Sequence, residues 1–290
     1  MLLHQQEVMI MDSRILTPKH LDKFREHLIR EEKSEVTRDK YLRDVRAFAH
    51  YAAGRVIEKS LLLEYKSQLI PRYAVRSINS MLASLNSFFR FMGWTDCQVK
   101  NLRFQRQSYC AEETELSKAE YLRLLDMAAQ NGNDQLRLVM QTLGGTGIRI
   151  SELQYFTVES VRQGKITVRC KSKTRVILIP GKLKKLLLTY AKRRKIGRGR
   201  IFITKNGNPL DRSNVWAQMK KLCAKAGVDP RKVFPHNFRK LFARTFYRME
   251  RDIAKLADIL GHGNIETTRI YIMTTGSEHL RKIERLGLVV

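Results

Sequence analysis

The second half of the chain contains the stretch LGHGNIETTRIY, which spans Leu260–Tyr271. Its glycine at 261 predicts the end of one helix, and the polar residues after it predict a turn that holds His262. Tyr271 then falls on the helix that follows this turn. A tyrosine at such a position is more often half-buried packing than a chemical group. The stretch therefore predicts a helix–turn–helix arrangement and has to be weighed with the rest of the chain.

A second segment, TGIRISEL (Thr146–Leu153), carries an arginine at the start of a predicted helix. Glycines at 144, 145 and 147 are expected to break the preceding helix, which we predict over 134–143. Glu152 lies three residues after Arg149 on the same helix face, where its carboxylate can brace the guanidinium. For this segment alone, a surface arginine or a salt-bridge partner is the favoured interpretation.

A third segment, HNFR (His236–Arg239), follows Pro235, where a helix is predicted to begin. His236 and Arg239 are three residues apart and face the same way. A positive pair at a helix N-terminus suits a phosphate, because the free N–H groups and the helix dipole also favour an anion there. A capping histidine beside an exposed arginine explains the segment equally well.

A predicted β-hairpin supplies the fourth segment. Residues 165–170 and 174–179 are rich in Val, Ile and Thr, with a turn around Lys171-Ser172-Lys173. Such a turn can project a lysine into a groove. Exposed lysines are also common at sheet edges, where they protect against aggregation, so this signal is weak by itself.

Taken in their order along the chain, the four segments resemble the signature of the tyrosine recombinase (phage integrase) family: TGxRxSEL, a hairpin lysine, HxxR, and LGH with a tyrosine nine residues later. The resemblance implies the catalytic residues Arg149, Lys171, His236, Arg239, His262 and the nucleophile Tyr271, supported by Glu152. The hairpin turn is shorter than the family's usual glycine-containing turn, so Lys173 stays open as the alternative general acid. Lys240 stands where many members carry a second histidine, and we expect it to tune the site.

These residue types suit the cleavage of a phosphodiester. Two guanidiniums, those of Arg149 and Arg239, can clamp the non-bridging oxygens on which charge develops. Tyr271 needs cationic surroundings and a proton acceptor, with His236 as base or positioning group and His262 holding the phosphate. A hairpin lysine would protonate the leaving 5′ oxygen. A covalent phosphotyrosine conserves the energy of the broken bond, so we expect no cofactor, no metal and no ATP, and the chain has no GxxxxGK[ST] loop.

The composition points to nucleic acid as the partner. Lys and Arg number 55 against 28 acidic residues, which gives the 290-residue chain a formal net charge of +27. Such a charge attracts polyanions. No apolar run approaches the length of a membrane span, and no signal-peptide pattern opens the chain. The four cysteines are scattered without a CxxC pair, which argues against a zinc site or a disulfide framework and fits a cytoplasmic protein.

Helical periodicity and one hairpin predict a mainly α protein with a small antiparallel β-sheet. We predict an N-terminal extension (1–16), an all-helical domain (17–98), a linker (99–113), an α+β domain (114–276) and a C-terminal tail (277–290). By the resemblance, the first domain is a SAM-like core-binding domain and the second the tyrosine-recombinase catalytic domain. The tail carries an apolar stripe, which favours docking on a neighbouring subunit over packing on its own domain.

The resemblance also implies partners. The substrate would be double-stranded DNA with an inverted-repeat core site, bound by a homo-tetramer that exchanges strands through a Holliday junction, with an accessory directionality factor left open. The residues before Leu16 are too few for the separate arm-binding domain of larger phage integrases, so we expect a simple core-site recombinase. A mobile-element integrase is placed first and a Xer-type chromosome-dimer resolvase second. The rival hypotheses are a type IB topoisomerase, which relaxes DNA without strand exchange, and a catalytically silent DNA-binding protein.

Overall fold

The computed structural model describes residues 14–103, 115–170, 173–273 and 276–288. The chain divides into two compact units, Met1–Arg106 and Gln107–Val290. Each unit has its own hydrophobic core. The fold class predicted from the sequence, mainly α with a small antiparallel sheet, is confirmed.

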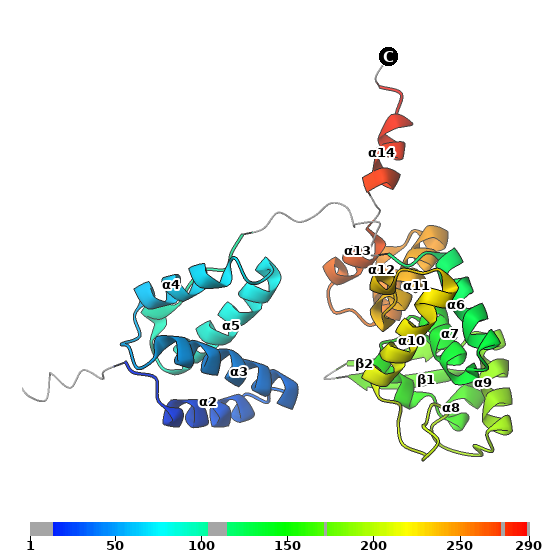
Figure 1. The fold of residues 1–290 in the computed structure, drawn as a ribbon, viewed down its shortest axis with the longest axis horizontal. Coiled ribbons are helices and arrows are strands. Elements are labelled where there is room, and N and C mark those ends of the chain that lie inside the picture. Colours follow the sequence, from blue (N-terminus) through cyan, green and yellow to red (C-terminus); the bar gives the residue numbers. More distant parts are fainter. Residues whose placement is uncertain (1–13, 104–114, 171–172, 274–275, 289–290) are drawn as a thin grey trace, which may run out of the picture. The chain divides into compact units, whose positions relative to one another are not determined.

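In the described part of the first unit, four helices pack together (Figure 1). Their core is rich in aromatic side chains. The helices are α2 (Pro18–Arg30), α3 (Glu35–Ala52), α4 (Lys59–Leu69) and α5 (Val75–Phe91), followed by the short 3-10 helix η1 (Thr95–Cys97). Thr17 precedes α2 and Pro18 opens it, an order that favours the start of a helix. Phe24, Phe48, Phe88 and Phe89 are fully buried, and several of their rings meet edge to face. These aromatic contacts add to the energy of burial and hold the helices in one arrangement.

The segment after η1 is held on α5 by two asparagines. The side chain of Asn86 bonds both the N–H and the carbonyl of Val99, and Asn79 does the same for Leu102. Residues 99–102, assigned to the linker by their loss of periodicity, thus pack on the first unit. The remaining bounds of the linker stay a prediction, because residues 104–114 lie outside the described residues.

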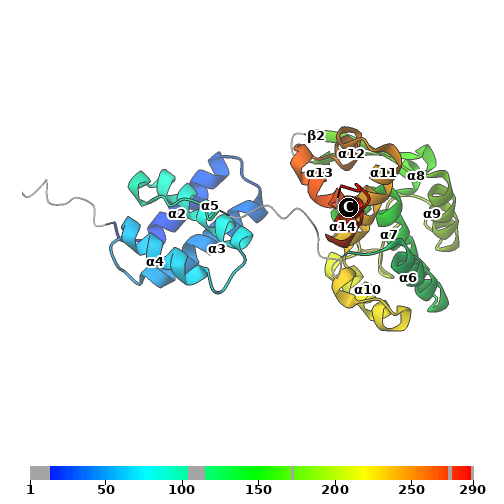
Figure 2. The ribbon, with the colours of Figure 1, turned by 90° about the horizontal axis from the view of Figure 1, so that it is seen from above.

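The second unit is built around α7 (Asp134–Thr146), which packs against α6 (Lys118–Gln130), α9 (Gly181–Arg193), α10 (Arg212–Ala226) and α11 (Pro235–Glu250). Its shorter elements are η3 (Ile150–Tyr155), α8 (Val158–Gln163), η4 (Pro230–Lys232), α12 (Ile253–Leu260), α13 (Ile265–Ile272) and α14 (Gly276–Glu284). Figure 2 shows α11, α12 and α13 grouped beside α7. Within the described ranges, no helix combines the length and the apolar character that crossing a bilayer requires.

The hairpin consists of β1 (Lys165–Cys170) and β2 (Lys173–Leu178), which pair antiparallel with Cys170 opposite Lys173. Lys173 is thus a strand residue, whereas the sequence pattern placed it in the turn. Lys171, which the sequence pattern also placed in the turn, lies outside the described residues. β2 contacts α12 and β1 contacts η3, which brings the hairpin beside two of the predicted site segments.

Candidate active site

Arg149 is placed by the end of α7 and the start of η3. The helix continues through Gly144 and Gly145 to Thr146, three residues past the predicted end at Leu143. Gly144 stays helical where the ring of Tyr121 packs 3.1 Å from the position of a Cβ. The helix ends at Gly147, whose φ of +63° and contact with Phe242 both require the absence of a side chain.

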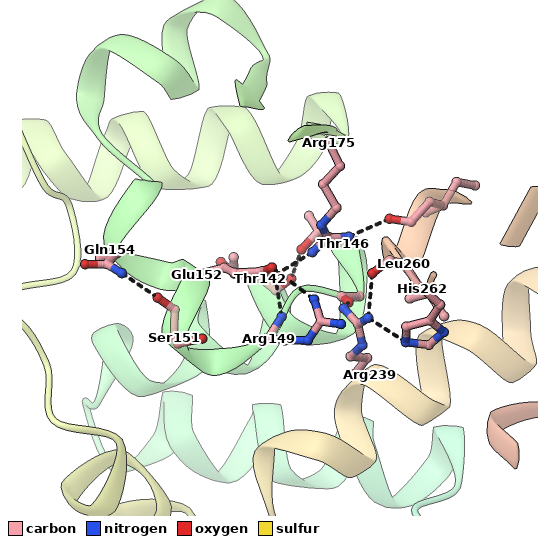
Figure 3. Close-up of polar contacts among 12 residues, drawn as sticks. Thr142, Thr146, Arg149, Ser151, Glu152, Gln154, Arg175, Arg239, Leu260 and His262 are labelled. Carbon is pink, nitrogen blue, oxygen red and sulfur yellow. Dashed lines mark hydrogen bonds and ion pairs between the residues drawn. The ribbon is translucent and has the colours of Figure 1, made fainter. Parts of the chain in front are cut away.

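Glu152 braces Arg149, as the three-residue spacing predicted. The buried carboxylate accepts the backbone N–H of Arg149 through Oε2 at 2.7 Å and its Nη1 through Oε1 at 3.3 Å. The Arg149 side chain remains 42% exposed, whereas that of Glu152 is 5% exposed. Glu152 therefore orients the Arg149 guanidinium, which stays partly exposed to solvent. Figure 3 shows the two side chains in contact.

Arg239 is the opposite case, because it is only 1% exposed. It lies one turn into α11, and its guanidinium donates to the carbonyls of Gly147 and Leu260 and to Nε2 of His262 (Figure 3). Burial and the nearby charge of Arg149 lower the pKa of Arg239 to about 10, so it stays charged at neutral pH. Its Nε has no hydrogen-bond partner among the described residues, which leaves a buried donor for a ligand oxygen.

His262 is held as a neutral ring. The Nη2 of Arg239 can only donate, so Nε2 of His262 accepts at 2.9 Å and Nδ1 donates to Oγ1 of Thr268 at 2.8 Å. Burial first, and then the charges of Arg239 and Arg149, lower the pKa of His262 to about 4. Gly261 ends α12 with a φ of +65°, which allows the chain to turn directly before this ring.

Tyr271 packs against both histidines of the site. Its ring meets His236 edge to face at 4.9 Å and His262 edge to face at 5.0 Å, and the guanidinium carbon of Arg239 is 5.9 Å from its centre. The residue is 8% exposed and belongs to a small apolar cluster with Ala243, Leu256 and Leu260. Burial, followed by the charges of Lys240 and Arg239, lowers the pKa of His236, so this ring too is neutral at neutral pH.

Lys240 is paired with a carboxylate rather than pointing freely at the site. Its Nζ donates to Glu115 at 3.0 Å, and Arg244 donates to the other oxygen of Glu115 at 2.8 Å. Glu115 is buried and begins the described part of the second unit. This ion-pair group fastens that segment to α11, the helix that carries His236 and Arg239.

The structure thus brings together five of the six predicted catalytic residues and Glu152. The sixth, Lys171, lies outside the described residues, and its alternative Lys173 begins β2. Sequence reasoning missed Arg175, which contacts Glu152 and the carbonyl of Ile259. The available signal was its position two residues before the buried Ile177, which places a charge on the inward face of a strand.

Chemically, the arrangement is a cationic site for an anion. The guanidiniums of Arg149 and Arg175 pair with the carboxylate of Glu152, and that of Arg239 lies near enough to feel the charge of both arginines, so positive charge is in excess among these four residues. The guanidinium of Arg149 is exposed, and the ring of Tyr271 lies near that of Arg239. Arginines oriented in this way bind the oxygens of a phosphate with fixed geometry.

The comparisons with known proteins agree with this chemistry. The phage integrase family matches residues 114–277, and the N-terminal SAM-like domain of phage integrases matches residues 21–95. The chain belongs to the phage integrase family. Its activity is that of a tyrosine recombinase, an enzyme of site-specific DNA recombination, so the family predicted from the four segments is confirmed.

Three similar proteins illustrate the relationship. The tyrosine recombinase XerA of Pyrococcus furiosus is 30% identical over 224 residues, which are 75% of this chain and 76% of that protein. The tyrosine recombinase XerD of Xanthomonas campestris is 26% identical over 278 residues, 85% of this chain and 84% of that protein. A lambda integrase tetramer bound to a Holliday junction shares the fold, with a TM-score of 0.72, 18% identity, and coverage of 92% of this chain and 80% of that chain.

The neutral state of His262 makes a prediction about acid stability. Between pH 6.5, its ordinary pKa, and about 4, the unfolded chain binds a proton at this ring that the folded protein does not. Stability should therefore fall as the pH falls through this window. We expect the melting temperature of the wild type to drop more between pH 7 and pH 5 than that of His262→Gln, which keeps an acceptor and a donor but cannot titrate. Equal drops measured by calorimetry would contradict the assigned neutral ring.

Proposed function

We propose that this recombinase cleaves and rejoins DNA through a covalent bond between Tyr271 and a 3′ phosphate. The observation that carries the proposal is the position of Tyr271, whose ring contacts two neutral histidines and the guanidinium of Arg239. A tyrosine held only for packing would need none of these polar neighbours. A nucleophile needs a proton acceptor on one side and a bound phosphate on the other.

The attack follows from the same geometry. The exposed Arg149 and the buried donor of Arg239 would hold the two non-bridging oxygens of the scissile phosphate. The Tyr271 oxygen attacks phosphorus, the bond to the 5′ oxygen breaks, and the tyrosyl proton passes to His236. The pKa of His236 is lowered, so the ring is free to accept a proton at neutral pH. His262, already bonded to Arg239 at 2.9 Å, orients that guanidinium.

The leaving group needs its own proton. A lysine of the hairpin, Lys171 with Lys173 as the alternative, would donate it to the 5′ oxygen, since β2 runs beside the site. Rejoining is the reverse: a 5′ hydroxyl attacks the phosphotyrosine and releases Tyr271. Attack by the 5′ hydroxyl of a second duplex exchanges strands and forms a Holliday junction.

The assembly is proposed from a structural relative and from the tail. A lambda integrase of the same fold forms a tetramer on a Holliday junction, and we propose a homo-tetramer on two inverted-repeat core sites here. In α14, Leu280 and Ile283 are 56% and 51% exposed. Covering this apolar stripe on a neighbouring subunit would remove it from water, which supports the docking role of the tail.

The names of the relatives bear on the type of recombinase. The chain matches proteins named XerA and XerD over most of their length. We therefore place a Xer-type core-site recombinase ahead of a mobile-element integrase, reversing the order that the sequence alone suggested. With DNA as the substrate, the cytoplasm is the proposed place of action.

A covalent-capture experiment tests the proposal. Wild type and Tyr271→Phe are each incubated with duplexes that carry a randomised core and a nick beside it, so that the cleaved short strand diffuses away. DNA that stays on the protein after denaturation is sequenced. Capture by the wild type only supports the proposal and reveals the core site. Capture by neither protein, despite tight binding of DNA, would favour a silent DNA-binding protein, and relaxation of supercoiled DNA without site preference would favour a topoisomerase.

Binding itself should depend strongly on salt. The net charge of +27 predicts an interface dominated by phosphate contacts. If six to ten phosphates are contacted, affinity should fall by roughly 10³–10⁵ between 50 and 200 mM salt, because bound counterions are released. Fluorescence anisotropy of a labelled duplex across this range measures the slope. An affinity that does not change with salt would contradict the electrostatic origin of binding.

A further inference from the structure

Arg175 joins three parts of the active site from a position on β2. Its Nη2 donates to Oε2 of Glu152, and its Nη1 donates to the carbonyl of Ile259 at 2.6 Å. The side chain is 11% exposed, far less than that of Arg149, and Figure 3 shows it reaching toward Glu152. One buried side chain thus connects the hairpin, the carboxylate that braces Arg149, and the end of α12.

The contact with α12 is made where that helix turns toward His262. The last carbonyls of a helix lack partners within it and carry the negative end of its dipole. Arg175 donates a hydrogen bond to the carbonyl of Ile259, and Arg239 donates one to the carbonyl of Leu260. The next residue is Gly261, where a Cβ would lie 2.4 Å from Cδ of Arg175. The turn and the arginine are therefore packed too closely to move independently.

The contact with Glu152 is shared with Arg149. Oε2 of Glu152 accepts from Arg175 and from the backbone N–H of Arg149, while Oε1 accepts from the Arg149 guanidinium. Both oxygens of the carboxylate are engaged, so its rotation would break contacts with both arginines. The orientation of Arg149 consequently depends on Arg175, although no contact between the two guanidiniums is needed.

The polar contacts of Arg175 are not the most stable way to fill this part of the fold. The Nε of Arg175 is buried and has no hydrogen-bond partner among the described residues. Ion pairs in buried positions are often no more stable than well-packed apolar side chains of the same volume. The contacts of Arg175 are better explained by the geometry that they impose than by the stability that they add.

We propose that Arg175 is a positioning residue for DNA cleavage, which sets the distance between Arg149 on one side of the phosphate site and the His262 turn on the other. This inference rests on the proposed function of the site. The hairpin would then have two roles. It carries the lysine proposed as the general acid, and its strand β2 fixes the position of Arg149 relative to the His262 turn. Arg175 itself does not contact the phosphate.

The kinetic test compares Arg175→Gln and Arg175→Lys with Arg162→Gln, which removes an exposed arginine from α8. We expect Arg175→Gln to lower the single-turnover cleavage rate by about 10²-fold at saturating protein, with a Kd for DNA within about threefold of wild type. Arg175→Lys should recover about tenfold of this loss, because an ammonium can reach one of the two acceptors. Arg162→Gln should leave the cleavage rate unchanged. A rate loss that disappears at saturating protein would overturn the proposal.

A substrate with a neutral methylphosphonate at the scissile position tests whether Arg175→Gln acts by misplacing Arg149 or by a general loss of active-site structure. Such a substrate places less demand on a guanidinium that neutralises the phosphate. If Arg175 acts through Arg149, the defect of Arg175→Gln should shrink on this substrate. A defect of the same size on both substrates would show that Arg175 does not act through the phosphate clamp.

A readout independent of activity distinguishes this proposal from that of the overall function. Amide hydrogen exchange is followed at Arg149, whose N–H donates to Glu152, and at His262, whose N–H donates to the carbonyl of Ala257. Arg175→Gln should accelerate exchange at both amides together, and Arg162→Gln at neither. Unchanged exchange at both would overturn the positioning role. If Arg175→Gln accelerates exchange at both amides but the wild type captures no DNA, the proposed function is refuted and the positioning role of Arg175 stands.

Discussion

Replacing Tyr271 with phenylalanine is expected to abolish covalent capture of DNA and to lower strand cleavage by at least about 10⁴-fold. The ring contacts with His236 and His262 are made by edges that phenylalanine retains, so the local packing should persist. Only the hydroxyl that we propose as the nucleophile is lost. The measurement is the appearance of a protein–DNA band on a denaturing gel under single-turnover conditions.

Binding is the control for this variant. One hydroxyl contributes little to an interface formed by a chain with a net charge of +27, so we expect the Kd for DNA to stay within about threefold of wild type. The melting temperature should also be close to that of wild type. A covalent band that persists in Tyr271→Phe would assign the nucleophile to another residue.

Replacing Arg239 with lysine should be nearly as damaging although the charge is kept. The guanidinium of Arg239 reaches the carbonyls of Gly147 and Leu260 and the ring of His262 at the same time. An ammonium on a shorter, unforked side chain cannot serve all three. We expect cleavage to fall by about 10²–10³-fold, the effect of losing an oriented donor to a developing oxyanion.

The same substitution should also destabilise the fold. It leaves at least one buried carbonyl without a donor, which costs about 1–3 kcal/mol. Chemical denaturation measures this loss, and Arg248→Lys, an exposed position on the same helix, is the matched control. Full activity in Arg239→Lys would show that charge alone, without the forked geometry, suffices at this position.

Much of the fold could be predicted from the sequence because its signals are local. The side chains of Ile78, Leu82, Leu85, Phe88 and Phe89 recur at helical spacing along α5, and each of them is fully buried. The helix end predicted from Gly261 is confirmed in α12, which stops at Leu260 because glycine readily adopts the conformation that follows. Predictions from local sequence were wrong where a contact between distant residues determined the conformation. Gly144 and Gly145 were expected to break α7, yet the helix continues through both and Gly144 packs against Tyr121.

The candidate site divides in the same way. The spacing of Arg149 and Glu152 and the order of HxxR and LGH with its tyrosine can be recognised in a single chain, because each motif lies within one element or one turn. Their convergence could be inferred only from resemblance to a family, and the structure supplies it physically through the carbonyls of Gly147 and Leu260, both bound by Arg239.

By itself, then, the sequence determined the helical domains, the hairpin, the cationic character and the set of candidate reactive groups. Tertiary structure alone decided that Arg175 is buried against Glu152, that His262 is neutral and bonded to Thr268, and that Lys240 is paired with Glu115. The physical reason is distance along the chain. Periodicity and capping act over a few residues, whereas burial, hydrogen-bond partners and pKa values depend on groups that only the packed fold brings together.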